Sequence, residues 1–426
     1  MDISWDEVQR EALKVLIEYI RIDTTNPPGN EKAAADFLRR ILNAEGLDVH
    51  EYAKDSARPN ILCRLRGDGT KRPLILLNHM DVVMAERDQW RVDPFAGAVK
   101  DGFVWGRGAL DMKGLGIIEL MAFLLVHRST LPLSRDLIYL AVSDEETGGA
   151  MGGEWLINHL ESELDAEYLI NEGGAGWRIG DMTGFNLAVG EKGPLWLLLR
   201  TEGPPGHGSV PVAENAVVRL ARALSAIAEY RQPIRVIGQM RGFLEKAGID
   251  PDIDPNELAT QGLLAIPHIS AMFSNTISPT VLRAGEKENV IPSKAEAVLD
   301  CRLLPGVTVE DFIHDLKRVI GDEEVHVEII KTYESSVSAV DTEMYRLLED
   351  ILEEVYPGVP VLPTISTGFT DSRWFRARGT TCYGILPFIS DFEVLRTMHG
   401  HDERIDIQSL GQGSRVIFEM IKRLNT

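Results

Sequence analysis

Short apolar runs that alternate with helical patterns set the strongest limit on the fold of this chain. Four such runs lie at Ile61–Leu65, Leu74–Leu77, Leu137–Val142 and Tyr168–Ile170, and a helical pattern at Gly114–His127 separates the second from the third. Continuous apolar runs of this length are typical of strands buried on both faces, and their alternation with helices favours parallel pairing. We therefore predict an α/β domain with a mixed, largely parallel sheet and helices on both faces.

The middle of the chain has a different order of elements. After the strand-like Leu195–Thr201 and the helical Asn215–Ala228, an irregular insert occupies residues 231–267. The remaining elements are two strands, a helix and a strand, at Ser274–Leu282, Ala295–Arg302, Val309–Ile320 and Val325–Ile330. The order β-α-β-β-α-β is the ferredoxin-like arrangement. We therefore predict a catalytic domain formed by residues 1–192 and 333–426, with a ferredoxin-like α+β lid or dimerisation domain inserted at 193–332.

The composition narrows the class of protein. A chain of 426 residues with 44% apolar and 26% charged residues is long enough for two globular domains. A net charge of −21 argues against nucleic acid and against an anionic membrane surface as partners. No apolar run reaches the roughly 18 residues of a membrane span. The first residues also lack the features of a signal peptide. We therefore predict a cytoplasmic protein with no nucleic-acid or membrane partner.

The three cysteines exclude two kinds of site. Cys63, Cys301 and Cys382 lie far apart and form no CxxC pair. Neither a disulfide framework nor a thiolate zinc site is therefore supported. A metal site in this chain has to use nitrogen and oxygen ligands.

Histidine and acidic residues follow the predicted strands, at the position where α/β sheets bind ligands. His79 comes directly after one strand, and Asp81 is placed to orient its imidazole through the second ring nitrogen. Asp111 follows the glycine-rich stretch that begins at Gly106; it suits a helix N-cap, and it also suits a carboxylate that binds two metal ions. Glu172 stands at the end of another strand. Each position alone is weak support for a metal site.

Three consecutive acids, Asp144, Glu145 and Glu146, come directly after an apolar run. A solvated acidic loop would have the same sequence, but acids next to a buried strand are costly unless positive charge compensates them. Metal-dependent hydrolysis uses such a pairing, because one carboxylate holds the ion while its neighbour takes a proton from water. Near the C-terminus, spacing alone allows either His399 or His401 as a further ligand.

Eight motifs appear in order along the chain: HMD at 79–81, GRGALDMKG at 106–114, DEETGG at 144–149, NEGG at 171–174, GHGS at 206–209, NVIP at 289–292, TDSR at 370–373 and HGHDE at 399–403. Over nearly its whole length the chain resembles the M20 family of metallopeptidases and deacylases, which includes aminoacylases and glutamate carboxypeptidases. The resemblance implies two Zn²⁺ ions, for which Co²⁺ or Mn²⁺ could substitute. By this resemblance, Asp111 is expected to bridge the two ions and to precede a cis peptide bond. His79 and Glu172 are expected to bind one ion, and Glu146 and His399 the other.

Further roles follow from the same resemblance. The family has a histidine four residues before a glutamate, here Glu403, and this selects His399 over His401. Glu145 corresponds to the general base that later protonates the leaving amine. His207, in the inserted domain, corresponds to a histidine that reaches the active site of the partner subunit in a homodimer and stabilises the tetrahedral oxyanion.

The resemblance also indicates how a substrate is held. Arg373 matches an arginine whose planar guanidinium binds the substrate carboxylate through two hydrogen bonds, although an ion pair with Asp371 is an alternative. Asn275 corresponds to a polar donor, and Gly368 to a position of close approach. The expected substrate is a small N-acyl amino acid, which a deacylase would cleave, or a peptide with a free carboxylate, which a carboxypeptidase or dipeptidase would cleave.

Two other classes are disfavoured. A binding protein on the same fold would be expected to lack metal ligands, whereas all five candidates and the base are present. A serine hydrolase would need a GxSxG turn, and the stretch Gly206–Val210 does not fit it.

Overall fold

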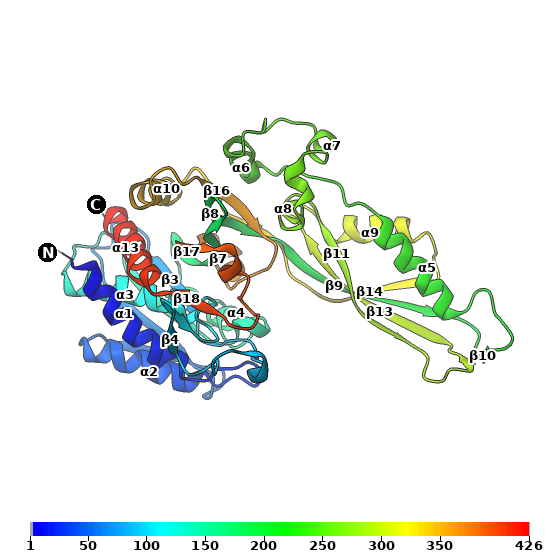
Figure 1. Ribbon diagram of the computed structural model, residues 1–426, viewed down its shortest axis with the longest axis horizontal. Helices are drawn as coiled ribbons and strands as arrows, with labels where there is room; N and C mark the ends of the chain where they lie inside the picture. The colour runs from blue at the N-terminus through cyan, green and yellow to red at the C-terminus, as the bar shows by residue number, and fades with distance from the viewer. Residues whose placement is uncertain (1–2, 426) are drawn as a thin grey trace. The chain divides into compact units, whose positions relative to one another are not determined.

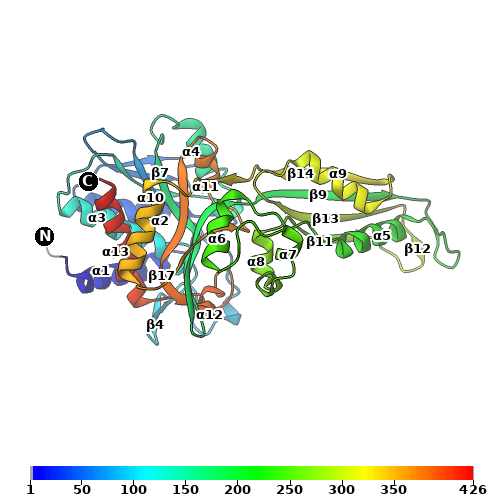
Figure 2. The same cartoon turned by 90° about the horizontal axis from the view of Figure 1, so that it is seen from above.

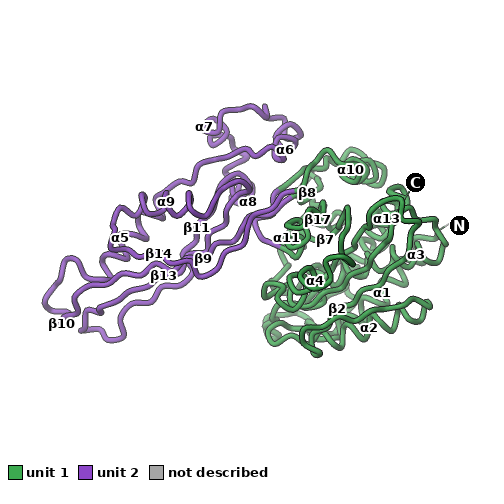
Figure 3. The backbone as a smooth tube through the Cα atoms, turned by 180° about the vertical axis from the view of Figure 1, so that it is seen from behind, with its two compact units in different colours: residues 1–189, 338–364, 370–426 green, residues 190–337, 365–369 purple. Residues whose placement is uncertain are grey.

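The computed structural model describes residues 3–425 and divides into two compact units (Figure 3). Unit 2 contains residues 190–337 and 365–369, and unit 1 contains the rest of the chain. Residues 365–369, which the sequence placed in the second part of the catalytic domain, belong to unit 2. The reason is local packing: the Lys192 N–H donates to the Ser366 carbonyl at 3.1 Å, and the Phe369 ring centroid lies 6.3 Å from that of Trp196.

A mixed sheet forms the centre of unit 1. Its strand order is β1 (Val49–Tyr52), β2 (Asn60–Leu65), β6 (Leu137–Val142), β3 (Leu74–His79), β7 (Tyr168–Ile179), β17 (Thr381–Asp391), β8 (Met182–Glu191) and β15 (Ser336–Val337). Strand β15 and the last two residues of β8 belong to unit 2. The central pairs β6–β3, β3–β7 and β7–β17 are parallel, whereas β1–β2, β2–β6 and β17–β8 are antiparallel. The predicted mixed, largely parallel sheet is therefore confirmed.

Helices cover both faces of this sheet (Figure 1). Strands β3 and β6 are buried at every position, as expected for continuous apolar runs between two layers. One layer contains α1 (Trp5–Ile20), α3 (Lys113–Arg128) and α13 (Ile407–Leu424), which pack on one another. Helix α10 (Glu343–Val355) lies beside α13 (Figure 2). The other layer contains α4 (Gly153–His159) and α11 (Ser372–Arg376), whose Leu156 and Phe375 join a cluster with Ile75 and Leu77.

Other helices and strands also belong to unit 1. They are α2 (Glu31–Ala44), α12 (Phe392–Leu395), β16 (Val361–Ser366, whose last two residues are in unit 2) and a three-stranded sheet of β4 (Ala98–Lys100), β5 (Phe103–Trp105) and β18 (Arg404–Asp406). Among residues 3–425, no helix has the length and the apolar character needed to span a membrane.

Unit 2 is built on a four-stranded antiparallel sheet. Its order is β11 (Thr276–Ala284), β13 (Lys294–Leu303), β9 (Gly193–Glu202) and β14 (Val325–Thr332). Helices α5 (Ala216–Glu229) and α9 (Val309–Ile320) pack together against the sheet and enclose an apolar core that includes Leu197, Leu220, Leu299 and Leu316. The predicted order β-α-β-β-α-β is confirmed. The insert expected to be irregular at 231–267 contains α6 (Arg241–Lys246) and α7 (Pro255–Leu258), and α8 (Pro267–Met272) begins at its last residue.

Helix α3 carries a buried acid beneath the carboxyl end of β3. The Glu119 side chain is fully buried and accepts a hydrogen bond from Asn78 Nδ2 at 3.0 Å. Burial raises the pKa of Glu119 well above its ordinary value, so the folded protein favours the neutral acid. In the unfolded chain the same group ionises near its ordinary pKa, and the free energy of unfolding therefore loses this contribution as pH rises.

Replacing Glu119 with glutamine is expected to stabilise the protein increasingly as pH rises. Glutamine is neutral at every pH and can keep the hydrogen bond with Asn78, so it removes the cost of keeping a proton on a buried acid. The melting temperatures of the wild type and of Glu119→Gln would be compared at about pH 5.5 and about pH 8.5, with a larger gain expected at the higher pH. An equal difference at both pH values would contradict this account of Glu119.

Candidate active site

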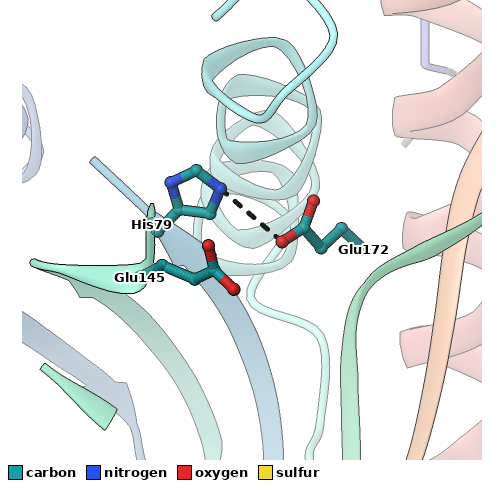
Figure 4. A group of neighbouring side chains, drawn as sticks. All are labelled: His79, Glu145 and Glu172. Carbon is teal, nitrogen blue, oxygen red and sulfur yellow. Dashed lines mark ion pairs between the residues drawn. The ribbon is translucent and has the colours of Figure 1, made fainter. Parts of the chain in front are cut away.

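The carboxyl ends of the parallel strands bring the candidate residues of unit 1 together. In the register of β3 and β6, His79 pairs with Val142, so the segment after β6 starts beside His79. Strand β7 pairs with β3 on its other side and carries Glu172. Figure 4 shows that the His79, Glu145 and Glu172 side chains point toward one another from three separate elements.

Asp111 lies between two histidines. Its Oδ1 is 3.0 Å from His79 Nε2, and its Oδ2 is 2.9 Å from His399 Nε2. His79 Nε2 also lies 3.6 Å from Glu172 Oε1, and His399 Nε2 lies 3.3 Å from Glu146 Oε2. Each histidine therefore shares Asp111 with the other and has one further carboxylate of its own.

The charges of this cluster are unbalanced. Four carboxylates, from Asp111, Glu145, Glu146 and Glu172, meet two imidazoles. Burial and the neighbouring Glu172 raise the pKa of Glu145 well above its ordinary value, and burial together with Asp111 raises the pKa of Glu172. Glu146 Oε1 is buried without a hydrogen-bond partner among residues 3–425. Since nitrogen and carboxylate donors of this kind suit Zn²⁺, the residues present fit bound divalent cations.

Among residues 3–425, two groups of three donors satisfy the distances of a metal site. Ligand atoms of His79, Glu145 and Glu172 lie within 4.8 Å of one another, and the same holds for His79, Asp111 and Glu146. The first group includes Glu145, which corresponds to a general base in the family resemblance. The geometry is therefore compatible with two roles for Glu145, that of a base and that of a metal ligand.

Asp81 lies beside the second ring nitrogen of His79 and also holds the acidic loop. The ring nitrogen Nδ1 of His79 lies 2.9 Å from the backbone carbonyl of Asp81 and 3.5 Å from its carboxylate oxygen Oδ1. The carboxylate also accepts the backbone N–H groups of Glu145 and Glu146 at 3.2 and 3.1 Å. Asp81 is therefore beside the imidazole as expected, and its catalytic role stays a prediction.

Asp144, the first of the three consecutive acids, pairs with an arginine. It has a φ of +71°, a left-handed conformation that aspartate tolerates better than most residues. Its Oδ1 lies 2.9 Å from Nη1 of Arg58, which also pairs with Glu31. Arg58 supplies the positive charge expected beside the acids. It could not be identified from the sequence, because it lies far from the acids along the chain.

Glu403 ties two loops of the site together. Its carboxylate accepts the N–H groups of Leu110 at 2.8 Å and Asp111 at 3.1 Å, and it pairs with Arg107 Nη1 at 2.6 Å. Arg107 Nη2 in turn donates to the Gly400 carbonyl at 2.8 Å, next to His399. Glu403, which the sequence used only to select His399, thus positions Asp111. Arg107 was not among the residues predicted from the sequence.

Two details of the resemblance are also present in the structure. The peptide bond between Asp111 and Met112 is cis. His399 is the histidine beside Asp111, whereas Nε2 of His401 lies 4.0 Å from Glu86 on the surface.

Arg373 packs against the turn that follows the acidic loop. Its Nη2 donates to the Gly148 carbonyl at 2.9 Å, and its guanidinium carbon lies 4.5 Å from the centre of the Trp374 ring. The neighbouring Asp371 carboxylate is buried, and a Cβ at Gly149 would lie 2.6 Å from its Oδ1. Glycine is therefore required at this turn.

The other three sequence candidates belong to unit 2. His207 is exposed, and its Nδ1 accepts the N–H of Ser209 at 3.2 Å and lies 2.7 Å from the Ser209 hydroxyl. Because a lone pair on Nδ1 accepts the N–H, the neutral ring carries its proton on Nε2. Asn275 Oδ1 accepts the N–H of Leu304 at 2.9 Å. A Cβ at Gly368 would meet only Ser366 Oγ, at 3.8 Å. Their roles toward a substrate stay predictions.

The protein has an α/β fold with a mixed sheet, and the parallel strands of this sheet end in a cluster of carboxylates and imidazoles. This combination is typical of metal-dependent hydrolases. The comparison with known families agrees. Residues 75–423 match the model of peptidase family M20/M25/M40, and the chain belongs to this family.

Individual relatives match nearly the whole length of this chain. The N-fatty-acyl-amino acid synthase/hydrolase PM20D1 of Homo sapiens is 28% identical, covering 98% of this chain and 88% of its own. Aminoacylase-1 of Sus scrofa is 26% identical, covering 98% and 96%. Among solved structures, the M20 family metallo-carboxypeptidase Sso-CP2 from Sulfolobus solfataricus shares the fold, with a TM-score of 0.77, 21% identity and coverage of 97% and 98%.

Proposed function

We propose that this protein hydrolyses the amide bond of N-acyl amino acids at a site with two metal ions. The observation that carries the proposal is the position of Asp111 between His79 and His399, each of which has a further carboxylate of its own. The relatives named as an N-fatty-acyl-amino acid hydrolase and as an aminoacylase favour an acyl substrate over a peptide.

The residues divide into two sets of ligands. His79 and Glu172 would hold one ion, Glu146 and His399 the other, and Asp111 both. Zinc suits these donors, and Co²⁺ or Mn²⁺ could replace it. When bound, such ions polarise a carbonyl group and lower the pKa of water.

Glu145 is placed to transfer protons. Its backbone is held by Asp81, and its side chain faces His79 and Glu172 (Figure 4). In the proposed reaction, the Glu145 carboxylate takes a proton from the attacking water and then delivers it to the departing nitrogen. The Nε2–H of His207 from the partner subunit of a homodimer would donate to the oxyanion. The exposure of His207 in the single chain is consistent with this role.

Arg373 is proposed to bind the substrate carboxylate, and Arg373→Lys is expected to raise KM. Lysine keeps the charge but loses the planar pair of donors, so KM should rise about 10- to 100-fold with a smaller change in kcat. Steady-state kinetics on an N-acyl amino acid and on its C-terminal amide would measure this. The amide lacks the carboxylate, and the variant should therefore handle it as the wild type does. An equal loss on both compounds would mean that Arg373 only supports the turn at Gly148.

A substrate panel tests the proposed function. The metal-loaded protein would be assayed for free amino acid released from N-acetyl and long-chain N-acyl amino acids, dipeptides and acyl-glutamates. Release from the acyl compounds alone is expected. Release from the dipeptides alone would replace the proposal by a peptidase, the activity named for Sso-CP2.

A further inference from the structure

Asn26 lies buried between the two acidic segments of the site. It belongs to the connection between α1 and α2, far in sequence from the residues that it contacts. Its Nδ2 lies 2.8 Å from Asp81 Oδ2, 3.2 Å from Asp144 Oδ1 and 3.1 Å from Thr147 Oγ1. The side chain is 4% exposed, so these contacts are shielded from water. One amide group therefore meets two buried carboxylates and a hydroxyl.

The two carboxylates beside Asn26 also accept hydrogen bonds from the backbone of the acidic loop. Asp81 accepts the N–H groups of Glu145 and Glu146, and Asp144 accepts the N–H of Met151 at 3.0 Å. Two buried carboxylates that share a small space repel each other unless donors lie between them. Arg58 supplies a donor to Asp144, whereas Asp81 receives side-chain N–H donation from Asn26.

We propose that Asn26 is a positioning residue for the reaction. By donating to Asp81 and to the far side of the same loop, its amide fixes the carboxylate that holds the backbone of Glu145 and Glu146. Glu145 then keeps the orientation that proton transfer needs, and Glu146 faces the metal cluster. The inference rests on the proposed function for the role of Glu145, whereas the effect of Asn26 on the loop is independent of it.

The test combines kinetics with backbone hydrogen exchange on the metal-loaded protein. In Asn26→Ala, kcat should fall about 10- to 100-fold, the range expected for a lost supporting contact, while KM changes little. Exchange of the amides in a peptide covering 143–151 should become faster, because Asp81 no longer has a fixed position. Asn26→Asp should lower kcat further, since it adds a third carboxylate. Asn26→Ser keeps a small donor, so its kcat should lie between those of the wild type and Asn26→Ala. This variant replaces Asn26→Ala in the test if the alanine variant does not fold.

Asn425 provides a matched control. It is also a buried asparagine: its Oδ1 accepts the Ser134 N–H at 3.0 Å, and its Nδ2 donates to the Ile421 carbonyl at 2.7 Å. Asn425→Ala should lower thermal stability while kcat and the exchange of 143–151 stay unchanged. In the Glu145→Gln background, Asn26→Ala should lower kcat by a smaller factor than it does in the wild type, because part of the lost contact acts through Glu145.

The possible results distinguish the positioning role of Asn26 from the proposed role of Glu145 as the base. Unchanged kcat and unchanged exchange in Asn26→Ala would overturn the inference. A loss of kcat without faster exchange would also overturn it, since the loop would then be fixed without Asn26. Faster exchange in Asn26→Ala together with a fully active Glu145→Gln would support the positioning of the loop and refute the proposed role of Glu145.

Discussion

Replacing Glu145 with glutamine is expected to lower kcat by on the order of 10³-fold while both metal ions stay bound. Glutamine has nearly the same shape but cannot accept the proton of the attacking water. The backbone contact with Asp81 is unaffected, so the loop and the neighbouring Glu146 should keep their places. Metal content by mass spectrometry and kcat on an N-acyl amino acid measure the two parts of this expectation.

The neighbouring acid is the control for this variant. Glu146 lies 3.3 Å from His399 Nε2 and is proposed as a ligand, so Glu146→Gln should lower the metal content as well as kcat. Loss of metal in Glu145→Gln would instead make Glu145 a ligand, as its closeness to His79 and Glu172 allows. Full activity of Glu145→Gln with the metals bound would refute its role as the base.

Asp111→Asn is expected to remove both activity and most of the bound metal. Asparagine keeps one oxygen of the side chain but replaces the other by a donor, so it cannot present a carboxylate oxygen toward both His79 and His399. Ligand-bound native protein is stabilised by mass action, and the melting temperature of the metal-loaded protein should therefore fall as well. Metal content, kcat and melting temperature would be measured together, with an activity loss on the order of 10³-fold or greater.

Asp101 serves as the matched control for Asp111. It lies in the exposed turn between β4 and β5 with a φ of +54°, a conformation that asparagine also adopts readily. Asp101→Asn should keep the metal, the activity and the melting temperature. Retention of two ions in Asp111→Asn would contradict a shared ligand at this position.

The polar segments after the strands could be read from the sequence because their signal is local. A buried apolar run that stops at a histidine or an acid identifies the carboxyl end of a strand, and parallel strands expose these ends on one edge. His79 and Glu172 were found in this way, whereas spacing alone left His399 and His401 equivalent and the family resemblance selected His399. The structure places all three beside Asp111 or His79.

The supporting contacts could not be read in the same way. Asn26 and Arg58 stand in segments with no local pattern that marks them, and Arg107, although it lies within the motif at 106–114, has no neighbour in sequence that indicates its partner. Asn26 and Asp144 are 118 positions apart, and Arg107 and Glu403 are 296 apart. Each of these pairs exists only because the fold brings the two segments together.

The sequence by itself determined the class of fold and the acids and histidines at the strand ends, because the period of apolar residues and the position of polar ones are local properties. Its eight ordered motifs indicated the family by resemblance. Tertiary structure alone decided which partner each group has. It gave the Asp81 carboxylate the backbone N–H groups of Glu145 and Glu146 as partners in addition to the ring of His79, and it compensated Asp144 with Arg58. The physical reason is that a buried charge is stabilised by whichever donors lie within hydrogen-bond distance, and that distance is set by packing between segments remote in sequence.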